Sequence, residues 1–289
     1  MTRSIVPRAN ETESGGVGVV NRDLQMTDHD FQTICSLIHG HAGIALAPHK
    51  MEMVYSRLAR RLRHYGMTRF KDYLALLQRS GSDEWEAFTN ALTTNLTSFF
   101  REAPHFDVMA DYVKTLKHAP RIWSCAASTG EELYSIAITL FETLGATASQ
   151  AKVLGTDIDT QVLSKARQGV YPLEGTRAVG EERLRRFFLR GKGDSAGLVR
   201  VSKELQQLIE FRRLNLLDQK WDIQGPFDII FCRNIMIYFD YETQTHLLDK
   251  MADLLAPGGL FFAGHSENFS AQTKKMKLLR NTVYRRMDH

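Results

Sequence analysis

Residues 121–132 have the sequence RIWSCAASTGEE, from Arg121 to Glu132. The apolar start predicts a buried strand, and apolar residues at helical spacing continue after the turn as far as Phe141. Small residues between a strand and a helix let a ligand approach the backbone closely. In an open α/β sheet such a turn lies at the carboxyl edge, where ligands bind. Because Glu131 and Glu132 would repel a phosphate, we expect a positively charged ligand rather than a dinucleotide.

Strands and helices alternate after this stretch. We expect strands at 151–156, 227–232, 259–263 and 282–286, and helices at 160–168 and 241–255. This alternation predicts an α/β fold with a doubly wound, mainly parallel sheet.

One block, 169–216, breaks the alternation. Residues 187–190 and 198–201 flank a glycine-containing loop and predict a hairpin, to which 208–211 could add a third strand. We therefore expect a small antiparallel β-subdomain inserted at about 170–214.

The chain before this domain has a helical pattern. Helices are expected after Thr27, a plausible N-cap, and over 49–64, 70–78 and 83–92. We assign 1–25 to a mobile tail, 26–89 to an all-helical domain, 90–105 to a linker and 106–289 to the α/β domain.

Composition sets broad limits on function. Of 289 residues, 43% are hydrophobic and 24% charged, as in ordinary globular proteins. No apolar run reaches the length of a membrane span, and the first 25 residues lack the apolar core of a signal peptide. The three cysteines have no metal-like spacing and fit a reducing cytoplasm. The net charge of +4 does not by itself require nucleic acid.

Polar residues follow two of the predicted strands. Asp157 either holds ribose hydroxyls at the sheet edge or, like Asp159, caps the next helix. Arg233 and Asn234 follow a buried strand that needs no polar ending, which favours a role in a binding site. Tyr238 either lines the same pocket or packs in the core.

Two loops have less specific signals. Residues 90–102, NALTTNLTSFFRE, make a poor helix and a good hydrogen-bonding linker, in which Arg101 could also pair with a ligand carboxylate. Residues 265–268, HSEN, could suggest a metal or a Ser/His couple, but their partners lack convincing spacing. We expect a packed, hydrogen-bonded loop there and no metal.

These segments together resemble the CheR family of S-adenosylmethionine-dependent methyltransferases of bacterial chemotaxis. The resemblance covers about 31–284 and rests on NALTTNLTSFFRE, ASTGEE, TDID, NLL, GPFDIIFCRNIMIYF and GHSENF. It implies a Rossmann-like class I methyltransferase domain that converts chemoreceptor glutamates to methyl esters and releases S-adenosylhomocysteine. By the same resemblance, the cofactor contacts fall on Asn95, Thr97, Arg101, Glu132, Asp157, Asn215, Leu216, Arg233 and Asn234.

We expect Arg101 and Tyr238 to be the catalytic residues, beside the cofactor contacts implied by the resemblance. The resemblance has one visible departure, because Leu133 stands where the family usually has proline, and this could shift the helix start. A glutamate carboxylate, with a pKa of about 4.3, is already an ionised nucleophile, so no general base is required. The enzyme then mainly aligns and desolvates the reacting groups.

Two other functions remain possible. A nucleic-acid methyltransferase would use the arginine-rich helix at 49–64 as its phosphate-binding surface. Against this function, the chain has no Asn/Asp-Pro-Pro-type motif for a base amino group, and its net charge is low. A non-catalytic module could have kept the fold without turnover, although Glu132, Asp157, Arg233 and Asn234 all remain.

Two surfaces could contact partners. Arg57, Arg60, Arg61 and His64 share one side of the 49–64 helix, either as a solvated face or as the binding surface for a glutamate-rich receptor segment. The hairpin loop at 191–197 either covers the pocket or, by the resemblance, docks a receptor's C-terminal peptide. We expect a cytoplasmic monomer that does not insert into membranes and does not bind nucleic acid.

Overall fold

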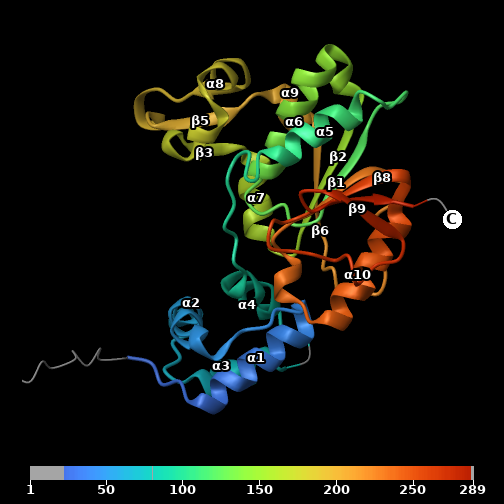
Figure 1. Cartoon of the computed structure of the whole chain (residues 1–289). Helices are drawn as coiled ribbons and strands as arrows, with labels where there is room; N and C mark the ends of the chain where they lie inside the picture. The colour runs from blue at the N-terminus through green and yellow to red at the C-terminus, as the bar shows by residue number, and fades with distance from the viewer. Residues whose placement is uncertain (1–22, 80, 288–289) are drawn as a thin grey trace, which may run out of the picture.

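A computed structural model describes residues 23–79 and 81–287. The N-terminal part is helical, as predicted (Figure 1), with elements α1 (Asp28–Ala42), η1 (Pro48–Lys50), α2 (Met51–His64), α3 (Phe70–Leu77) and α4 (Glu84–Leu92). Thr27 caps α1 in a reciprocal capping box with Asp30.

The predicted tail lies mostly outside the described residues, since these begin at Asp23. Its predicted end at residue 25 is wrong. Leu24 is only 5% exposed because it packs in the core of the helical domain, and Gln25 forms a bridge with Arg69.

The α/β domain has a seven-stranded sheet in the order β6-β2-β1-β7-β8-β10-β9. Its strands are β1 (Arg121–Ser124), β2 (Lys152–Asp157), β6 (Ile209–Arg213), β7 (Phe227–Cys232), β8 (Leu255–Ala263), β9 (Met276–Arg280) and β10 (Val283–Arg286). The strands from β6 to β8 are parallel, while β10 and β9 are antiparallel. The mainly parallel sheet is confirmed; β9 was not predicted.

Helices cover both faces of this sheet. Successive residues of β1 and β7 alternate between two cores: Ile122 and Ile229 face one, and Trp123 and Ile230 face the other. The first core includes α5 (Pro104–Val113) and α6 (Glu131–Leu144), and the second includes α10 (Tyr241–Leu254). α7 (Thr160–Gln168) and α9 (Lys203–Leu208) complete the helices around the strands.

The inserted subdomain is confirmed as a three-stranded antiparallel sheet in the order β3-β5-β4 (Figure 1). Its strands are β3 (Val170–Pro172), β4 (Phe188–Arg190) and β5 (Leu198–Val201); α8 (Glu181–Phe187), η3 (Leu173–Val179) and η4 (Gly193–Ser195) connect them. The predicted hairpin is the β4–β5 pair.

The prediction of 208–211 as the third strand of this subdomain is wrong. Leu208 ends α9, and the other three residues begin β6, which pairs in parallel with β2 in the main sheet, with Gly155 opposite Phe211. Ile209 is buried in the main core, so the apolar residues of this segment serve the large sheet. The third strand is instead β3, a short segment directly after Gly169.

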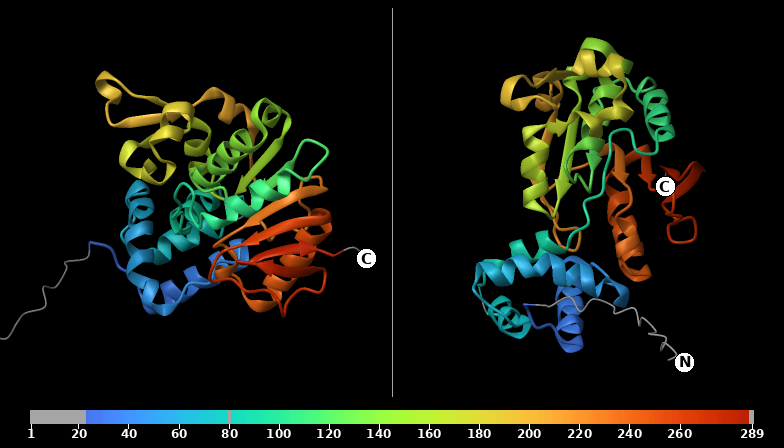
Figure 2. Two further views of the ribbon diagram at one scale, coloured as in Figure 1. Left: turned by 45° about the horizontal axis from the view of Figure 1, so that its top comes forward. Right: turned by 90° about the vertical axis from the view of Figure 1, so that its left-hand side faces the viewer.

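The linker connects the two domains. Figure 2 shows it running from the helical domain along the α/β domain to α5. It therefore passes the carboxyl ends of the parallel strands.

Candidate cofactor and active site

A cavity of about 350 Å³ lies at the carboxyl ends of β1, β2 and β7. The helical domain contributes Ala42, Ile44, Met53 and their neighbours to its wall, the linker contributes 92–98 and Arg101, and the sheet edge supplies the rest. All ten predicted cofactor and catalytic residues line this cavity: Asn95, Thr97, Arg101, Glu132, Asp157, Asn215, Leu216, Arg233, Asn234 and Tyr238.

The turn after β1 forms one wall. Ser128 has a left-handed backbone with φ 47°, and its hydroxyl donates to the Asn95 carbonyl at 3.0 Å. Gly130 has φ 98°, and a Cβ there would lie 3.0 Å from Tyr171 Oη. α6 begins at Glu131, so Leu133 at the usual proline position leaves a regular helix start and packs against Gly155.

Asp157 ends β2 with its carboxylate at the cavity. It accepts backbone N–H bonds from Ser128 at 2.8 Å and from Asp159 at 2.9 Å. Burial raises the pKa of Asp157 to about 6, against the opposing effect of these donors. The cap of α7 is Asp159, whose Oδ1 accepts from Gln161 and Val162. Asp157 is therefore held in place with its acidic oxygens toward the cavity, where they can accept hydroxyl hydrogen bonds.

The linker is fastened to this edge through Asp159. Asp159 Oδ2 accepts from Thr93 Oγ1 at 2.8 Å and from Asn95 Nδ2 at 2.9 Å. Both donors belong to the segment that lines the cavity, which also contains Thr97. This contact joins the linker to the end of β2.

Glu132 and Arg233 form a charged wall. Glu132 Oε1 accepts from Ser124 Oγ at 2.9 Å, and its Oε2 lies 3.3 Å from Arg233 Nε. Burial raises the pKa of Glu132, while the Arg233 guanidinium opposes that shift. Arg233 also donates to the Arg101 carbonyl. A carboxylate and a guanidinium at one cavity wall can bind the ammonium and carboxylate groups of an amino acid.

Asn234 holds an unusual backbone conformation beside Arg233, with φ 57°. Its N–H donates to Glu267 Oε2 at 3.0 Å, and its side-chain amide donates to Glu102 Oε1 at 3.2 Å. A Cβ at residue 264 would lie 2.9 Å from Asn234 N, so glycine there allows this approach. The loop at 265–268 is hydrogen-bonded, as predicted: Glu267 also accepts from Gly264 N at 2.6 Å.

Asn215 and Leu216 follow β6. The Asn215 amide donates to the His41 carbonyl at 2.7 Å and accepts from Leu217 N at 3.0 Å, which ties this loop to the end of α1. Leu216 is 7% exposed and gives the cavity an apolar wall.

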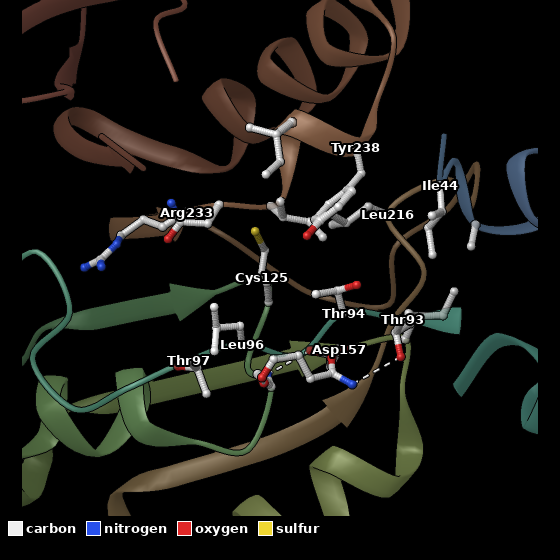
Figure 3. Close-up of a pocket in the computed structure, with 18 of the residues that line it drawn as sticks. Ile44, Thr93, Thr94, Leu96, Thr97, Cys125, Asp157, Leu216, Arg233 and Tyr238 are labelled. Carbon is white, nitrogen blue, oxygen red and sulfur yellow. Dashed lines mark hydrogen bonds between the residues drawn. The ribbon is translucent and has the colours of Figure 1, made fainter. Parts of the chain in front are cut away.

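Tyr238 lies across the cavity from Asp157, with Cys125 between them (Figure 3). It ends η5 (Met236–Tyr238), and its carbonyl accepts from Ala45 N at 3.1 Å. Of the two alternatives for Tyr238, the structure therefore shows the cavity position. Arg101 donates to the Leu96 carbonyl at 3.1 Å.

The predicted basic stripe on α2 lies apart from the cavity, and two of its residues have structural partners. Arg57 donates to the carbonyls of Leu92 at 3.1 Å and Thr93 at 2.7 Å. Arg61 makes a bidentate pair with Glu84 at 2.7 and 2.6 Å. Of the three predicted substrate-binding arginines, only Arg60 is exposed.

The sequence interpretation missed the wall that the helical domain forms. This wall consists of Ala42, Ile44, Ala45, Leu46, Ala47, Lys50 and Met53. These residues are mostly apolar and have no motif, so no sequence signal identified them. In the described ranges, 23–79 and 81–287, no helix is long and apolar enough to cross a membrane.

The strand order, the acidic residue that ends β2 and the cavity beside it define the class of protein. This is a class I S-adenosylmethionine-dependent methyltransferase fold with an N-terminal helical domain and an antiparallel insert. Residues 95–285 match the family described as CheR methyltransferase, SAM binding domain, and residues 29–93 match CheR methyltransferase, all-alpha domain. The chain belongs to the CheR methyltransferase family.

Relatives match along nearly the whole chain. A chemotaxis protein methyltransferase of Salmonella typhimurium is 52% identical over 262 residues, 90% of this chain and 91% of that protein. One from Klebsiella aerogenes is 51% identical over 285 residues, 98% of both chains. Chemotaxis protein methyltransferase 2 of Pseudomonas aeruginosa is 51% identical over 267 residues, 91% and 95% of the two chains.

Proposed function

We propose that this chain transfers methyl groups from S-adenosylmethionine to glutamate side chains in the cytoplasmic region of bacterial chemoreceptors. The observation that carries the proposal is the single cavity where Glu132, Asp157 and Arg233 meet residues of both domains. The names of the relatives supply the chemotactic context.

The residues of the cavity suit the cofactor. Asp157 would hold the ribose hydroxyls, Leu216 would contact the adenine, and Glu132, Arg233 and Arg101 would bind the methionine end. Asn95, Thr97, Asn215 and Asn234 would complete the cofactor contacts by resemblance to the family. When bound, S-adenosylmethionine supplies an activated methyl group on a sulfonium.

The substrate carboxylate needs no base. It is ionised at neutral pH, and the lining residues within the described chain include no histidine. Burial raises the pKa of the Cys232 thiol well above its ordinary value, which keeps it protonated and a poor nucleophile. Arg101 and Tyr238 would then act by aligning the substrate carboxylate in a cavity from which water is excluded.

Partner contacts form the second part of the proposal. The exposed Arg60, with Arg63 beside it on α2, would attract the acidic methylation region, while Arg57 and Arg61 support the helix. The β4–β5 loop would dock a receptor's C-terminal peptide, because an antiparallel edge can add a strand. We place the protein in the cytoplasm as a monomer.

The test is incubation with radiolabelled S-adenosylmethionine and receptor-bearing membranes, followed by treatment with base. Glutamyl methyl esters release methanol in base, whereas methylated amines and nucleic acids do not. Label that stays on the membrane protein after this treatment contradicts the proposal, and so does label found only on added nucleic acid.

A further inference from the structure

Three potential metal ligands, Glu102, His105 and His265, lie close together beside Arg233. None of the three lines the cavity, whereas Arg233 does. Glu102 Oε2 lies 3.5 Å from His105 Nδ1 and 3.9 Å from His265 Nε2. One ligand atom from each of the three residues lies within 4.8 Å of the others. The ligands come from two segments, 102–105 and 265, which the fold brings together.

The buried imidazole of His105 has a defined tautomer. Its side chain is 0% exposed, and Nε2 lies 2.6 Å from the Asn281 carbonyl, so Nε2 carries the hydrogen and donates it. In the neutral ring with this tautomer, Nδ1 carries no hydrogen. Nδ1 is left with a lone pair and no hydrogen-bond partner in the described chain.

The Glu102 carboxylate faces that lone pair. Its Oε1 accepts from Asn234 Nδ2 and from His265 N, but Oε2 has no hydrogen-bond partner among residues 23–79 and 81–287. The Glu102 side chain is only 9% exposed. His105 Nδ1 and Glu102 Oε2 are therefore two buried atoms, 3.5 Å apart, that lack a hydrogen-bond partner in the described chain, and a cation between them would bind to both.

We propose that Glu102 Oε2, His105 Nδ1 and His265 Nε2 bind a divalent transition-metal ion such as Zn²⁺. Imidazole nitrogen and carboxylate oxygen are zinc ligands, and three protein ligands leave a fourth position for water. Ligand atoms on a tetrahedral zinc lie about 3.3 Å apart, close to the spacing seen here. His265 is 56% exposed, so it can rotate to close the remaining distance.

Of two neighbours of this position, the Asn281 carbonyl favours an ion and Arg233 opposes it. A metal-bound histidine commonly donates its other N–H to a carbonyl, as His105 does to Asn281. Arg233 Nε lies 3.6 Å from Glu102 Oε2, so its charge opposes the ion. Arg233 is also 3.3 Å from Glu132 Oε2, however, and keeps that carboxylate as a partner.

The experiment is isothermal titration of the full-length, tag-free chain with Zn²⁺ alone. We expect one saturable site, weakened by roughly tenfold to a hundredfold in His265→Ala. His265 is exposed, so this variant should keep its fold, as checked by circular dichroism. His246→Ala removes another exposed histidine and should bind like the wild type. Glu102→Gln should weaken Zn²⁺ binding as His265→Ala does.

Substitution with Co²⁺ identifies the ligands. Co²⁺ bound by nitrogen and oxygen ligands absorbs visible light but lacks the strong near-ultraviolet band of a Co²⁺–thiolate bond. That band would indicate that a cysteine such as Cys35 binds the metal. A thiolate band overturns the proposal. So does the absence of saturable Zn²⁺ binding, or binding that is unchanged in His265→Ala.

Discussion

Left-handed backbone conformations concentrate around the candidate cofactor cavity. Phe100, Glu102, Ser128 and Asn234 have positive φ, although none is glycine. They lie immediately before and after Arg101, in the turn after β1 and beside Arg233. Surrounding contacts hold these conformations: Phe100 N donates to Ser135 Oγ, and Ser128 N donates to Asp157. Strain of this kind persists where the structure fixes functional groups.

Asp157 should give cofactor binding a pH dependence. Its folded pKa of about 6 lies above its ordinary value of 3.8 because of burial. Its contribution to folding stability is therefore present at low pH and is lost as the pH rises through about 6. Ligand binding follows the opposite trend, because the ionised carboxylate is the better acceptor for ribose hydroxyls. We expect the affinity for S-adenosylhomocysteine to fall as the pH drops below about 6.

The variant Asp157→Asn tests this prediction, with its affinity for S-adenosylhomocysteine measured by calorimetry at several pH values. It should bind about 1–3 kcal/mol more weakly at neutral pH and lose most of the pH dependence. Asp194→Asn, an exposed change, is the control. Wild-type affinity in Asp157→Asn would remove this residue from the ribose site.

Arg61 and Arg60 are adjacent but should differ in their effect on stability. Arg61 is the charge partner of Glu84, which is 4% exposed and also accepts from Tyr65 and Tyr73. Arg61→Ala would leave a buried carboxylate with only hydroxyl donors, so we expect a loss of about 2–3 kcal/mol in the free energy of unfolding. Arg60→Ala should change it by less than about 0.5 kcal/mol. Urea denaturation measures both; equal values would contradict the structural role of Arg61.

The helices and strands that were predicted correctly have clear patterns in their local sequence. β1, the small-residue turn and α6 follow from an apolar run, glycine and helical spacing. β3 and β9 were missed because β3 has only three residues and β9, MKLLR, is mainly exposed and has no alternation of apolar and polar residues. β6 was placed in the wrong sheet, since an apolar strand can pair with either sheet and only tertiary packing selects β2.

The β4–β5 loop depends on Gly191. A Cβ there would overlap the Ser195 carbonyl oxygen, so Gly191→Ala should distort the loop. If this loop docks a receptor peptide, the variant should retain less peptide in a pull-down with receptor C-terminal peptides. Gly175→Ala, whose Cβ would meet open space, is the matched control and should bind like the wild type. If the wild type, Gly191→Ala and Gly175→Ala retain the peptide equally, peptide binding does not depend on the conformation of this loop. If none of the three proteins retains the peptide, the docking proposal is contradicted.

The helical domain and the α/β domain share one cavity. The sequence predicted the residues at the sheet edge, because parallel strands bring their carboxyl ends together. It could not predict the wall at 42–47, which depends on how the helical domain packs against the loops after β6 and β7. The contacts of Asn215 with His41 and of Tyr238 with Ala45 fix that arrangement. The linker between the domains therefore forms part of the binding site (Figures 2 and 3).

We propose that the exposed basic surface of α2, Arg60 and Arg63, attracts the receptor during their encounter. Arg60→Glu with Arg63→Glu reverses charges outside the cavity, so affinity for S-adenosylhomocysteine should stay unchanged. Receptor methylation should slow by roughly tenfold at low salt, and the difference from the wild type should shrink as salt screens the charges. Lys277→Glu with Arg280→Glu makes the same change in net charge on β9 and is the matched control. If the control slows methylation equally, net charge rather than α2 governs the encounter; wild-type rates in the α2 variant contradict the proposed surface.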